Sequence, residues 1–302
     1  MDSQLVVSLK RRKNFYGSRV KVLAPAKINL YFNVLGTYPS GKPFSGYHRI
    51  ESIIERISLC DWITITIAQN PRIEIRSNIK SLETTANLCV RAAALMKKKY
   101  KIPYGFQIYL HKRIPMGSGL GGGSSDAAST MLALCALLKP ACPSKALYEL
   151  GSQVGSDVNF FLAQTPFALV RGRGEIVFPF EAPPLHHCII WPGAHVSTKE
   201  VYGNTRVKLT KFIPNVNIMI QALKTADRQL VCANSFNALE VSALSLSGKL
   251  RFAKNYFDSR GIFCRMTGSG SALFTFAPRY RLPGIARVAA ARKWVVANVR
   301  SF

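Results

Sequence analysis

The sequence predicts an α+β fold built in two parts, and three observations lead to this prediction. Apolar and polar residues alternate in short runs such as 28–34 and 63–67, which is the pattern of β-strands. Residues 87–100 are rich in Ala, Leu and Lys and have a helical period. Two prolines in Ala182-Pro183-Pro184 interrupt any regular element, so a domain boundary is expected there. The two predicted domains are residues 1–184, with a basic arm at 1–19, and residues 185–302.

The same patterns predict the other elements in order along the chain. A β-ribbon is expected from residues 63–67 and 73–75, joined by Asn70-Pro71. The helix expected at 127–138 ends before Pro140 and Pro143, which cannot continue it. Further strands are expected at 20–23, 106–110 and 188–191 and on both sides of 171–174 and 268–270. Further helices are expected at 144–151, 216–224 and 246–257, with a basic amphipathic helix near 284–298.

Composition excludes several classes of protein. No apolar run approaches the roughly 18 residues that span a bilayer. The short apolar patch at 5–7 precedes the basic residues 10–13, the reverse of a signal peptide, so a cytoplasmic protein without a membrane partner is expected. The seven cysteines include no Cys-x-x-Cys pair and sit mostly among apolar residues, which favours buried free thiols. The five histidines lack ligand spacing, so no structural metal is expected.

The formal net charge of +26 is the unusual feature of the composition. Such an excess attracts nucleic acid, anionic membranes or phosphorylated ligands. The basic residues are spread along the chain, however, and no nucleic-acid-binding motif accompanies them. A basic protein that binds nucleic acid without specificity stays an alternative, but no specific nucleic-acid partner is expected.

A glycine-rich loop carries the strongest functional signal. Residues 115–128 hold five glycines and three serines between a predicted strand and a predicted helix. Main-chain amides in such a loop, followed by a helix start, suit phosphate oxygens. The loop lacks the Gly-Lys-Ser/Thr ending of a Walker A loop. Gly117, Gly119 and Gly122 satisfy G-x-G-x-x-G, but the proline-rich 138–143 offers no second strand with an acidic residue, so dinucleotide binding is excluded on context.

The loop resembles the P-x-x-x-G-L-G-G-G-S-S-x-A-A motif of the GHMP kinases. Its triple glycine and double serine are the form found in the 4-diphosphocytidyl-2-C-methyl-D-erythritol kinases. Three more segments resemble that family: Ala24–Leu30, Gly155–Phe161 and Arg265–Ala272. The resemblance runs from Lys21 to about Phe276. It implies a two-domain GHMP kinase fold, with an N-terminal domain like domain 2 of ribosomal protein S5 and a ferredoxin-like C-terminal domain.

The resemblance also implies a reaction. ATP would phosphorylate the 2-hydroxyl of 4-diphosphocytidyl-2-C-methyl-D-erythritol, giving the 2-phosphate and ADP, in the non-mevalonate pathway to isopentenyl diphosphate. Mg²⁺ is expected because phosphoryl transfer needs charge neutralised between the β- and γ-oxygens. The partner is a small cytidine diphosphate derivative, and the protein is a monomer or homodimer. A GHMP kinase of another alcohol, such as homoserine, mevalonate or a sugar, is the main alternative.

By the resemblance, Asp157 is the catalytic carboxylate and Lys27 its neighbour. A nearby lysine lowers the pKa of a carboxylate and makes it a weaker base. Asp157 is therefore expected mainly to orient the substrate hydroxyl and accept its proton, and less to activate the hydroxyl for attack. Ser125 or Asp126 could contact Mg²⁺. The residues expected to bind ATP are Asn87, Leu88, Lys112, Pro115, Met116, Gly117, Ser118, Gly119, Leu120, Gly121, Gly122, Gly123, Ser124 and Ser125. The residues expected to bind the substrate are Asn29, Tyr47, His48, Thr198 and Tyr202.

The chain departs from the family pattern at four places. Asn159 stands where the family has proline after Asp-Val, and Arg49 stands where an acidic residue is common. About five extra residues at 40–44 lengthen the loop before Tyr47, and Ala238 replaces the usual Asp. None of these changes removes a phosphate-binding or catalytic group, so they bear on the detailed geometry of substrate binding.

Overall fold

The computed structural model describes residues 5–41, 44–138, 142–205, 214–276, 282 and 284–302. The chain divides into two compact units, each assembled from several segments. Unit 1 comprises Met1–Ala26, Cys60–Ile114 and Gly121–Gln164. Unit 2 comprises Lys27–Leu59, Pro115–Leu120 and Thr165–Phe302. The predicted domain boundary at residues 184 and 185 lies inside unit 2, and it stays a prediction.

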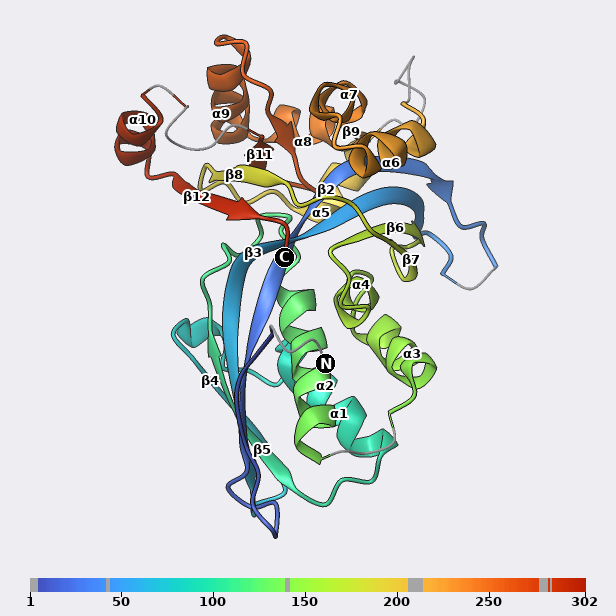
Figure 1. Ribbon diagram of the computed structural model, residues 1–302, viewed down its shortest axis with the longest axis vertical. Coiled ribbons are helices and arrows are strands. Elements are labelled where there is room, and N and C mark those ends of the chain that lie inside the picture. Colours follow the sequence, from blue (N-terminus) through green and yellow to red (C-terminus); the bar gives the residue numbers. More distant parts are fainter. Residues whose placement is uncertain (1–4, 42–43, 139–141, 206–213, 277–281, 283) are drawn as a thin grey trace. The chain divides into compact units, whose positions relative to one another are not determined.

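Unit 1 combines strands with four helices (Figure 1). β1 pairs antiparallel with the start of β2, and the end of β3 pairs antiparallel with β5. Helices α1 and α2 pack side by side along the strands, and α3 and α4 pack together beyond them. The elements are β1 (Val6–Lys10), the start of β2 (Arg19–Thr37), the end of β3 (His48–Ala68), β4 (Ile73–Ser77), α1 (Leu88–Lys99), β5 (Gly105–His111), α2 (Gly122–Leu138), α3 (Ser144–Val154) and α4 (Val158–Leu162), while the rest of β2 and β3 belongs to unit 2.

The core of unit 1 forms around α2. Almost every residue from Ser125 to Leu134 is buried, because this helix has small or apolar side chains on all sides. The helix begins at Gly122, five residues before the predicted start, so the second half of the glycine loop is already helical. Part of the predicted basic arm is also ordered, since Leu5 is buried and β1 lies in the sheet.

The predicted β-ribbon between 63–67 and 73–75 is wrong. Both segments are strands, but β5 lies between them, antiparallel to β3 and parallel to β4. The connection at Asn70 crosses the start of β5 at Gly105, where a Cβ would overlap the Asn70 carbonyl. This close crossing replaces the tight hairpin turn that the local sequence suggested.

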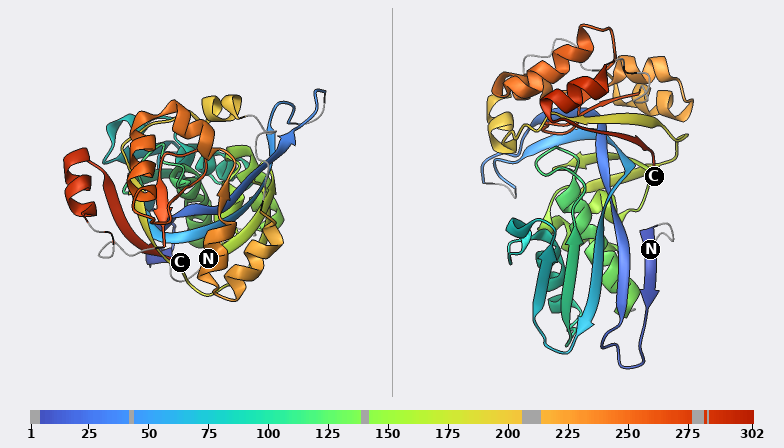
Figure 2. Two further views of the ribbon diagram at one scale, coloured as in Figure 1. Left: turned by 90° about the horizontal axis from the view of Figure 1, so that it is seen from above. Right: turned by 90° about the vertical axis from the view of Figure 1, so that its left-hand side faces the viewer.

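Unit 2 contains an antiparallel four-stranded sheet in the order β10-β11-β8-β12. Figure 1 and the right-hand view of Figure 2 show β8 and β12 side by side. In addition, β6 pairs with the first half of β3 and with β7, and β9 runs parallel to β2. The strands are β6 (Phe167–Gly172), β7 (Ile176–Phe180), β8 (His186–Trp191), β9 (Phe236–Asn237), β10 (Arg265–Met266), β11 (Leu273–Thr275) and β12 (Val295–Arg300).

The helices of unit 2 confirm two of the three predicted helical segments there. The helices are α5 (Thr198–Asn204), α6 (Val216–Lys224), α7 (Arg228–Asn234), α8 (Glu240–Leu246), α9 (Gly248–Asp258) and α10 (Ile285–Arg292). The helix predicted near 284–298 is wrong in its second half. Lys293 adopts a left-handed conformation (φ 56°) that ends α10, and the β-branched residues from Val295 on pair with β8 instead. Among the described residues, no helix is long and apolar enough to cross a membrane.

Candidate active site

The first half of the glycine loop, residues 115–120, is held in unit 2 by main-chain hydrogen bonds. The Lys27 amide donates to the Leu120 carbonyl at 3.0 Å, and the Ala272 amide donates to the Ser118 carbonyl at 2.8 Å. Gly119 has a φ of +78°, and a Cβ there would overlap the Thr267 carbonyl. Only glycine allows this backbone conformation together with this approach. The loop is therefore fixed between β2 and the turn that follows β10.

Lys27 lies at the junction of these segments and is only 4% exposed. Its ammonium group donates to Asn29 Oδ1 at 2.5 Å. A Cβ at Gly268 would lie 3.1 Å from both Lys27 Nζ and the Gly119 carbonyl. The structure thus brings together three motifs that are far apart in the sequence. A buried cation beside main-chain groups of two glycine turns is an arrangement suited to phosphate oxygens.

A network of hydrogen bonds holds Asn29 in place. Its amide donates to Thr267 Oγ1 at 2.9 Å, and its side chain donates to Ser52 Oγ at 2.8 Å. Asn237, whose side chain is buried, donates to the carbonyls of Met266 and Gly268 at 2.8 and 2.9 Å. Ser52, Thr267 and Asn237 were not among the residues predicted to form the site. Only Thr267 carried a signal, because it stands in the segment Arg265–Ala272, which resembles the kinase family.

The second half of the glycine loop forms the first turn of α2 in unit 1. Ser125 is fully buried, and its hydroxyl has no hydrogen-bond partner among the described residues. The first turn of α2 contains no acidic residue that would neutralise the positive end of the helix. Leu88 packs 3.2 Å from the Cβ position of Gly123. The structure therefore places Leu88, which is expected to bind ATP, next to the helix start within this unit.

Asn87 has a structural role that accompanies its predicted role. It is the N-cap of α1, and its side chain accepts from the Cys89 amide at 2.9 Å. Its side-chain amide also donates to the Leu82 carbonyl at 2.9 Å. The ATP contact expected of Asn87 stays a prediction.

Lys112 bridges two buried carboxylates beneath the start of α2. Its ammonium group contacts Asp61 and lies 2.7 Å from Asp126 Oδ2, and the three side chains are 5%, 0% and 4% exposed. Asp61 also accepts from the amides of Arg113 and Ile114, at 2.5 and 2.8 Å. Burial and the Asp61 carboxylate raise the pKa of Asp126 to about 8, while the two carboxylates raise that of Lys112. The cluster ties the end of β5 to α2.

Asp61 is the member of this cluster that the sequence analysis missed. It is 51 residues from Lys112 along the chain, and no motif marks it. The Nζ atom of Lys112 lies 3.1 Å from the Cβ position of Gly122, at the start of α2. Its direct contact with ATP stays a prediction.

Asp157 stands at the start of α4 in unit 1. It occupies the N-cap position, but its carboxylate makes no cap hydrogen bond to that helix. Gly155 precedes it in an extended conformation, and a Cβ there would lie 3.5 Å from Ser124 Oγ. The turn that carries Asp157 is thus adjacent to the first turn of α2.

The structure explains the Asn159 departure. The Asn159 side chain donates to Ser152 Oγ at 2.9 Å, which ties α4 to α3. It also packs against Gly151, where a Cβ would overlap its Oδ1 atom. A hydrogen bond between helices therefore constrains the chain behind Asp157, where the family pattern has a rigid proline.

The predicted substrate residues of unit 2 form an aromatic surface. The rings of His48 and Tyr202 stack with centroids 4.5 Å apart, and Thr198 Oγ1 lies 2.9 Å from Ser269 Oγ. Burial lowers the pKa of His48, which favours the neutral ring. Tyr47 is 54% exposed. The structure therefore brings His48 together with Tyr202 and places Thr198 beside Ser269 of the segment Arg265–Ala272.

The extra residues at 40–44 add an element that the sequence analysis did not assign. Phe44 packs edge-on against Tyr47 with centroids 6.5 Å apart. The Arg173 guanidinium lies 4.0 Å from the Phe44 ring centre and 5.3 Å from the Tyr47 ring centre. Such cation–π contacts hold flat side chains in place. Phe44 and Arg173 thus hold the Tyr47 ring in place.

Comparisons with known proteins agree with this geometry. The family profile described as the GHMP kinases N terminal domain matches residues 87–164. A 4-diphosphocytidyl-2-C-methyl-D-erythritol kinase of Brevibacillus brevis is 35% identical over 264 residues, covering 86% of this chain and 88% of that protein. The same enzyme of Citrifermentans bemidjiense is 33% identical over 290 residues, covering 94% and 99%.

Solved structures extend the comparison to the fold. A crystal structure of 4-(cytidine 5'-diphospho)-2C-methyl-D-erythritol kinase superposes with a TM-score of 0.74 at 31% identity, covering 92% of this chain and 98% of that one. A homoserine kinase from Cytophaga hutchinsonii has a TM-score of 0.68 at 18% identity, which shows a shared fold alone. Fold and site together define the class of small-molecule kinases called GHMP kinases, which use ATP as the phosphate donor. Within that class, the chain belongs to the 4-diphosphocytidyl-2-C-methyl-D-erythritol kinase family.

Proposed function

We propose that the protein transfers the γ-phosphoryl group of ATP to the 2-hydroxyl of 4-diphosphocytidyl-2-C-methyl-D-erythritol, in the cytoplasm. The products are the 2-phosphate and ADP, and the reaction belongs to the non-mevalonate pathway to isopentenyl diphosphate. The relatives in the family carry the name of this enzyme. The observation that carries the choice of substrate is the stacked pair of His48 and Tyr202.

A pyrimidine substrate fits that pair by its chemistry. A cytosine ring stacks on an aromatic face with a gain of about 1–3 kcal/mol. The neutral imidazole of His48 offers both a donor and an acceptor to the edge of the base. Homoserine and mevalonate contain no ring that could stack on this surface, and a simple sugar lacks the hydrogen-bonding edge of a base. The aromatic pair therefore supports the cytidine compound over those alcohols.

We assign the catalytic roles as the family resemblance suggests. Asp157 orients the substrate hydroxyl and accepts its proton, while Lys27 stabilises negative charge on the transferring phosphoryl group. The burial of Lys27 beside Gly119 and Gly268 supports its role, since a cation acts more strongly there than in water. The main-chain amides of residues 117–125 bind the phosphate chain of ATP.

The residues present fit Mg²⁺, which such a reaction requires. The buried hydroxyl of Ser125 and the Oδ1 atom of Asp126 have no hydrogen-bond partner among the described residues. Oxygen atoms are the ligands that Mg²⁺ prefers, often through water. When bound, the ion neutralises charge on the β- and γ-phosphate oxygens. Ser125 or Asp126 would hold the ion, either directly or through water.

A panel of acceptors tests the proposal. The purified protein is incubated with ATP, Mg²⁺ and one acceptor at a time, and ADP release is measured by a coupled assay. We expect turnover with the cytidylyl compound and none with homoserine or mevalonate. Phosphorylation of mevalonate with no reaction of the cytidylyl compound would overturn the assignment of substrate while leaving the GHMP kinase class intact.

A further inference from the structure

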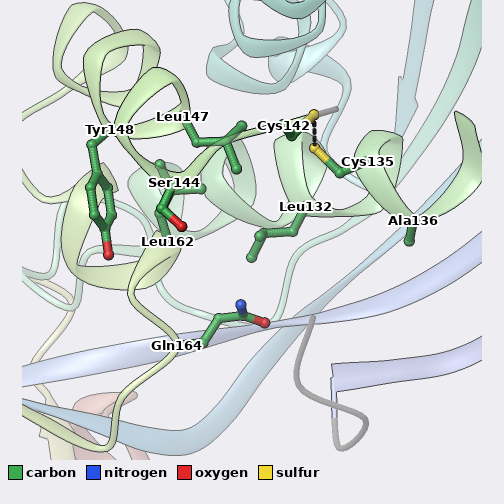
Figure 3. Close-up of a pocket in the computed structure, with 9 residues that line it drawn as sticks. All are labelled: Leu132, Cys135, Ala136, Cys142, Ser144, Leu147, Tyr148, Leu162 and Gln164. Atoms are coloured by element: carbon green, nitrogen blue, oxygen red, sulfur yellow. Dashed lines mark hydrogen bonds between the residues drawn. The ribbon is translucent and has the colours of Figure 1, made fainter. Parts of the chain in front are cut away.

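Two cysteines face each other where α2 ends and α3 is about to begin, in unit 1. Cys135 lies in the last turn of α2, and Cys142 lies two residues before α3. Their sulfur atoms are 2.7 Å apart (Figure 3). Both residues are half-buried free thiols, whereas Cys60 and Cys89 of the same unit are fully buried. Cys135 and Cys142 are therefore the more accessible thiols of unit 1.

The two sulfurs lie at the wall of a cavity of about 330 Å³. Its wall also includes Leu132, Leu147 and Tyr148, and Figure 3 shows the thiols of Cys135 and Cys142 pointing toward each other beside it. A half-buried thiol next to a cavity is accessible to a small reagent, whereas a fully buried thiol is inert. Thus the site combines two adjacent thiols with a route for a small molecule.

The geometry suits a covalent bond between these thiols. A disulfide joins sulfurs at about 2.05 Å and requires side chains that already point toward each other. The positions of Cys135 and Cys142 meet that requirement with a displacement of less than about 1 Å. In a reducing compartment such a bond is transient, since thiol-reducing systems reverse it.

We propose that Cys135 and Cys142 form a reversible disulfide by exchange with a low-molecular-weight disulfide such as oxidised glutathione. The Cys142 thiolate attacks one sulfur of the small disulfide, so that a mixed disulfide forms at Cys142 and one small thiol leaves. Cys135 then attacks Sγ of Cys142 and releases the second small thiol. Two cysteine thiols are oxidised and one small disulfide is reduced to two thiols, which take up the two protons.

The order of attack follows from the surroundings of the two thiols. Burial and the adjacent Cys142 raise the pKa of the Cys135 thiol well above its ordinary value. A thiol with a raised pKa is a poor first nucleophile in water, because little thiolate is present. It reacts well as the second nucleophile, once a sulfur that carries a good leaving group is held against it. Cys142 also lies outside any helix at the wall of the cavity, whereas Cys135 lies within α2, so Cys142 is the first residue to be modified.

The bond would link the end of α2 to the start of α3. The opposite end of α2 begins in the glycine loop, and α3 leads into the turn of Gly155 and Asp157. Within unit 1, α3 and α4 pack together and both contact α2. A disulfide at this point restricts the relative motion of the two helices that lead to these segments. Oxidation therefore acts on the unit that carries Asp157 without touching any residue assigned to binding.

Mass spectrometry of the whole protein tests the proposal independently of activity. The protein is equilibrated with mixtures of oxidised and reduced glutathione, its free thiols are alkylated, and its peptides are analysed. We expect a peptide that contains both Cys135 and Cys142, has lost two hydrogen atoms and is restored by dithiothreitol. We also expect the midpoint of thermal unfolding to be about 5 °C higher when the bond is present.

Single substitutions test the order of attack. In Cys135→Ser the exchange should stop at a stable glutathione adduct on Cys142, while in Cys142→Ser modification of Cys135 should be at least tenfold slower. Cys232→Ser is the matched control, since Cys232 is half-buried in α7 of unit 2, and it should leave the bond unchanged. Full alkylation of Cys135 and Cys142 in the wild-type protein after oxidation, or a bond to another cysteine, would overturn the proposal. Neither result would affect the proposed kinase function.

Discussion

Replacement of Lys112 by methionine should destabilise the protein strongly. Methionine keeps much of the side-chain volume but removes the ammonium group that bridges Asp61 and Asp126. Both acidic side chains are almost completely buried, and Asp126, whose pKa is about 8, is largely protonated at neutral pH. The Asp61 carboxylate therefore loses its counter-ion in a place that water does not reach. Removal of one partner from a buried ion pair costs about 3–5 kcal/mol. At roughly 2 °C per kcal/mol for a protein of this size, the unfolding midpoint should fall by about 6–10 °C.

Thermal unfolding measured by fluorescence, with and without an ATP analogue, is the suitable assay. Lys80→Met is the matched control, because Lys80 is 82% exposed and pairs with Glu83 at the surface of the same unit. Exposed pairs contribute little, so the midpoint of this control should stay within about 1 °C of the wild type. The difference between the two variants isolates the effect of burial.

A triple variant tests whether uncompensated charge causes the loss of stability. Combining Lys112→Met with Asp61→Asn and Asp126→Asn removes the unpaired charge, while an asparagine oxygen at position 61 can still accept from the amides of Arg113 and Ile114. The triple variant should regain more than half of the lost stability. A triple variant no more stable than Lys112→Met alone would show that lost packing, and not uncompensated charge, explains the effect.

Three further predictions concern catalysis and substrate binding. Asp157→Asn should reduce kcat by a factor of about 10² to 10⁴ while the Kd for ATP, measured by calorimetry, changes less than threefold; an active variant would exclude a proton-accepting role. Tyr202→Leu should raise the KM for the cytidylyl substrate by about tenfold or more through lost stacking, with the KM for ATP unchanged, and equal changes in both would contradict a role in base binding. The KM for the cytidylyl substrate should also rise as the pH falls through the pKa of His48, which lies below the ordinary histidine value of 6.5. Burial lowers the pKa of His48, so its neutral form is present above that lowered pKa and is lost as the pH falls through it; in His48→Gln this part of the pH profile should be absent.

The sequence predicted the segments that contain the site better than it predicted how they are held. Glycine-rich motifs predict phosphate-binding turns because few other structures need so many positive φ angles, and Gly117, Gly119 and Gly121 have them. The pairing of distant segments was not predictable in the same way. Asp61 reaches Lys112 across 51 residues, and nothing local marks it as a buried acceptor.

The two wrong predictions have a common physical cause. A pattern of apolar residues indicates which side of a segment is buried, but it does not specify the neighbour that covers it. The residues at 63–67 were expected to pair with the next strand in the chain, and β5 took that position. The residues from Val295 on were expected to extend a helix, and the strand β8 paired with them. In both cases a long-range hydrogen-bonded partner decided the structure.

The interleaving of the two units along the chain has a consequence for biosynthesis. Unit 1 uses no residue beyond Gln164, so all of it has left the ribosome while much of unit 2 is still unsynthesised. Residues Lys27–Leu59, although made early, belong to unit 2 and must wait for strands such as β6 and β9 before they acquire their final neighbours. During translation this segment is therefore the part of the nascent chain that most needs protection from aggregation.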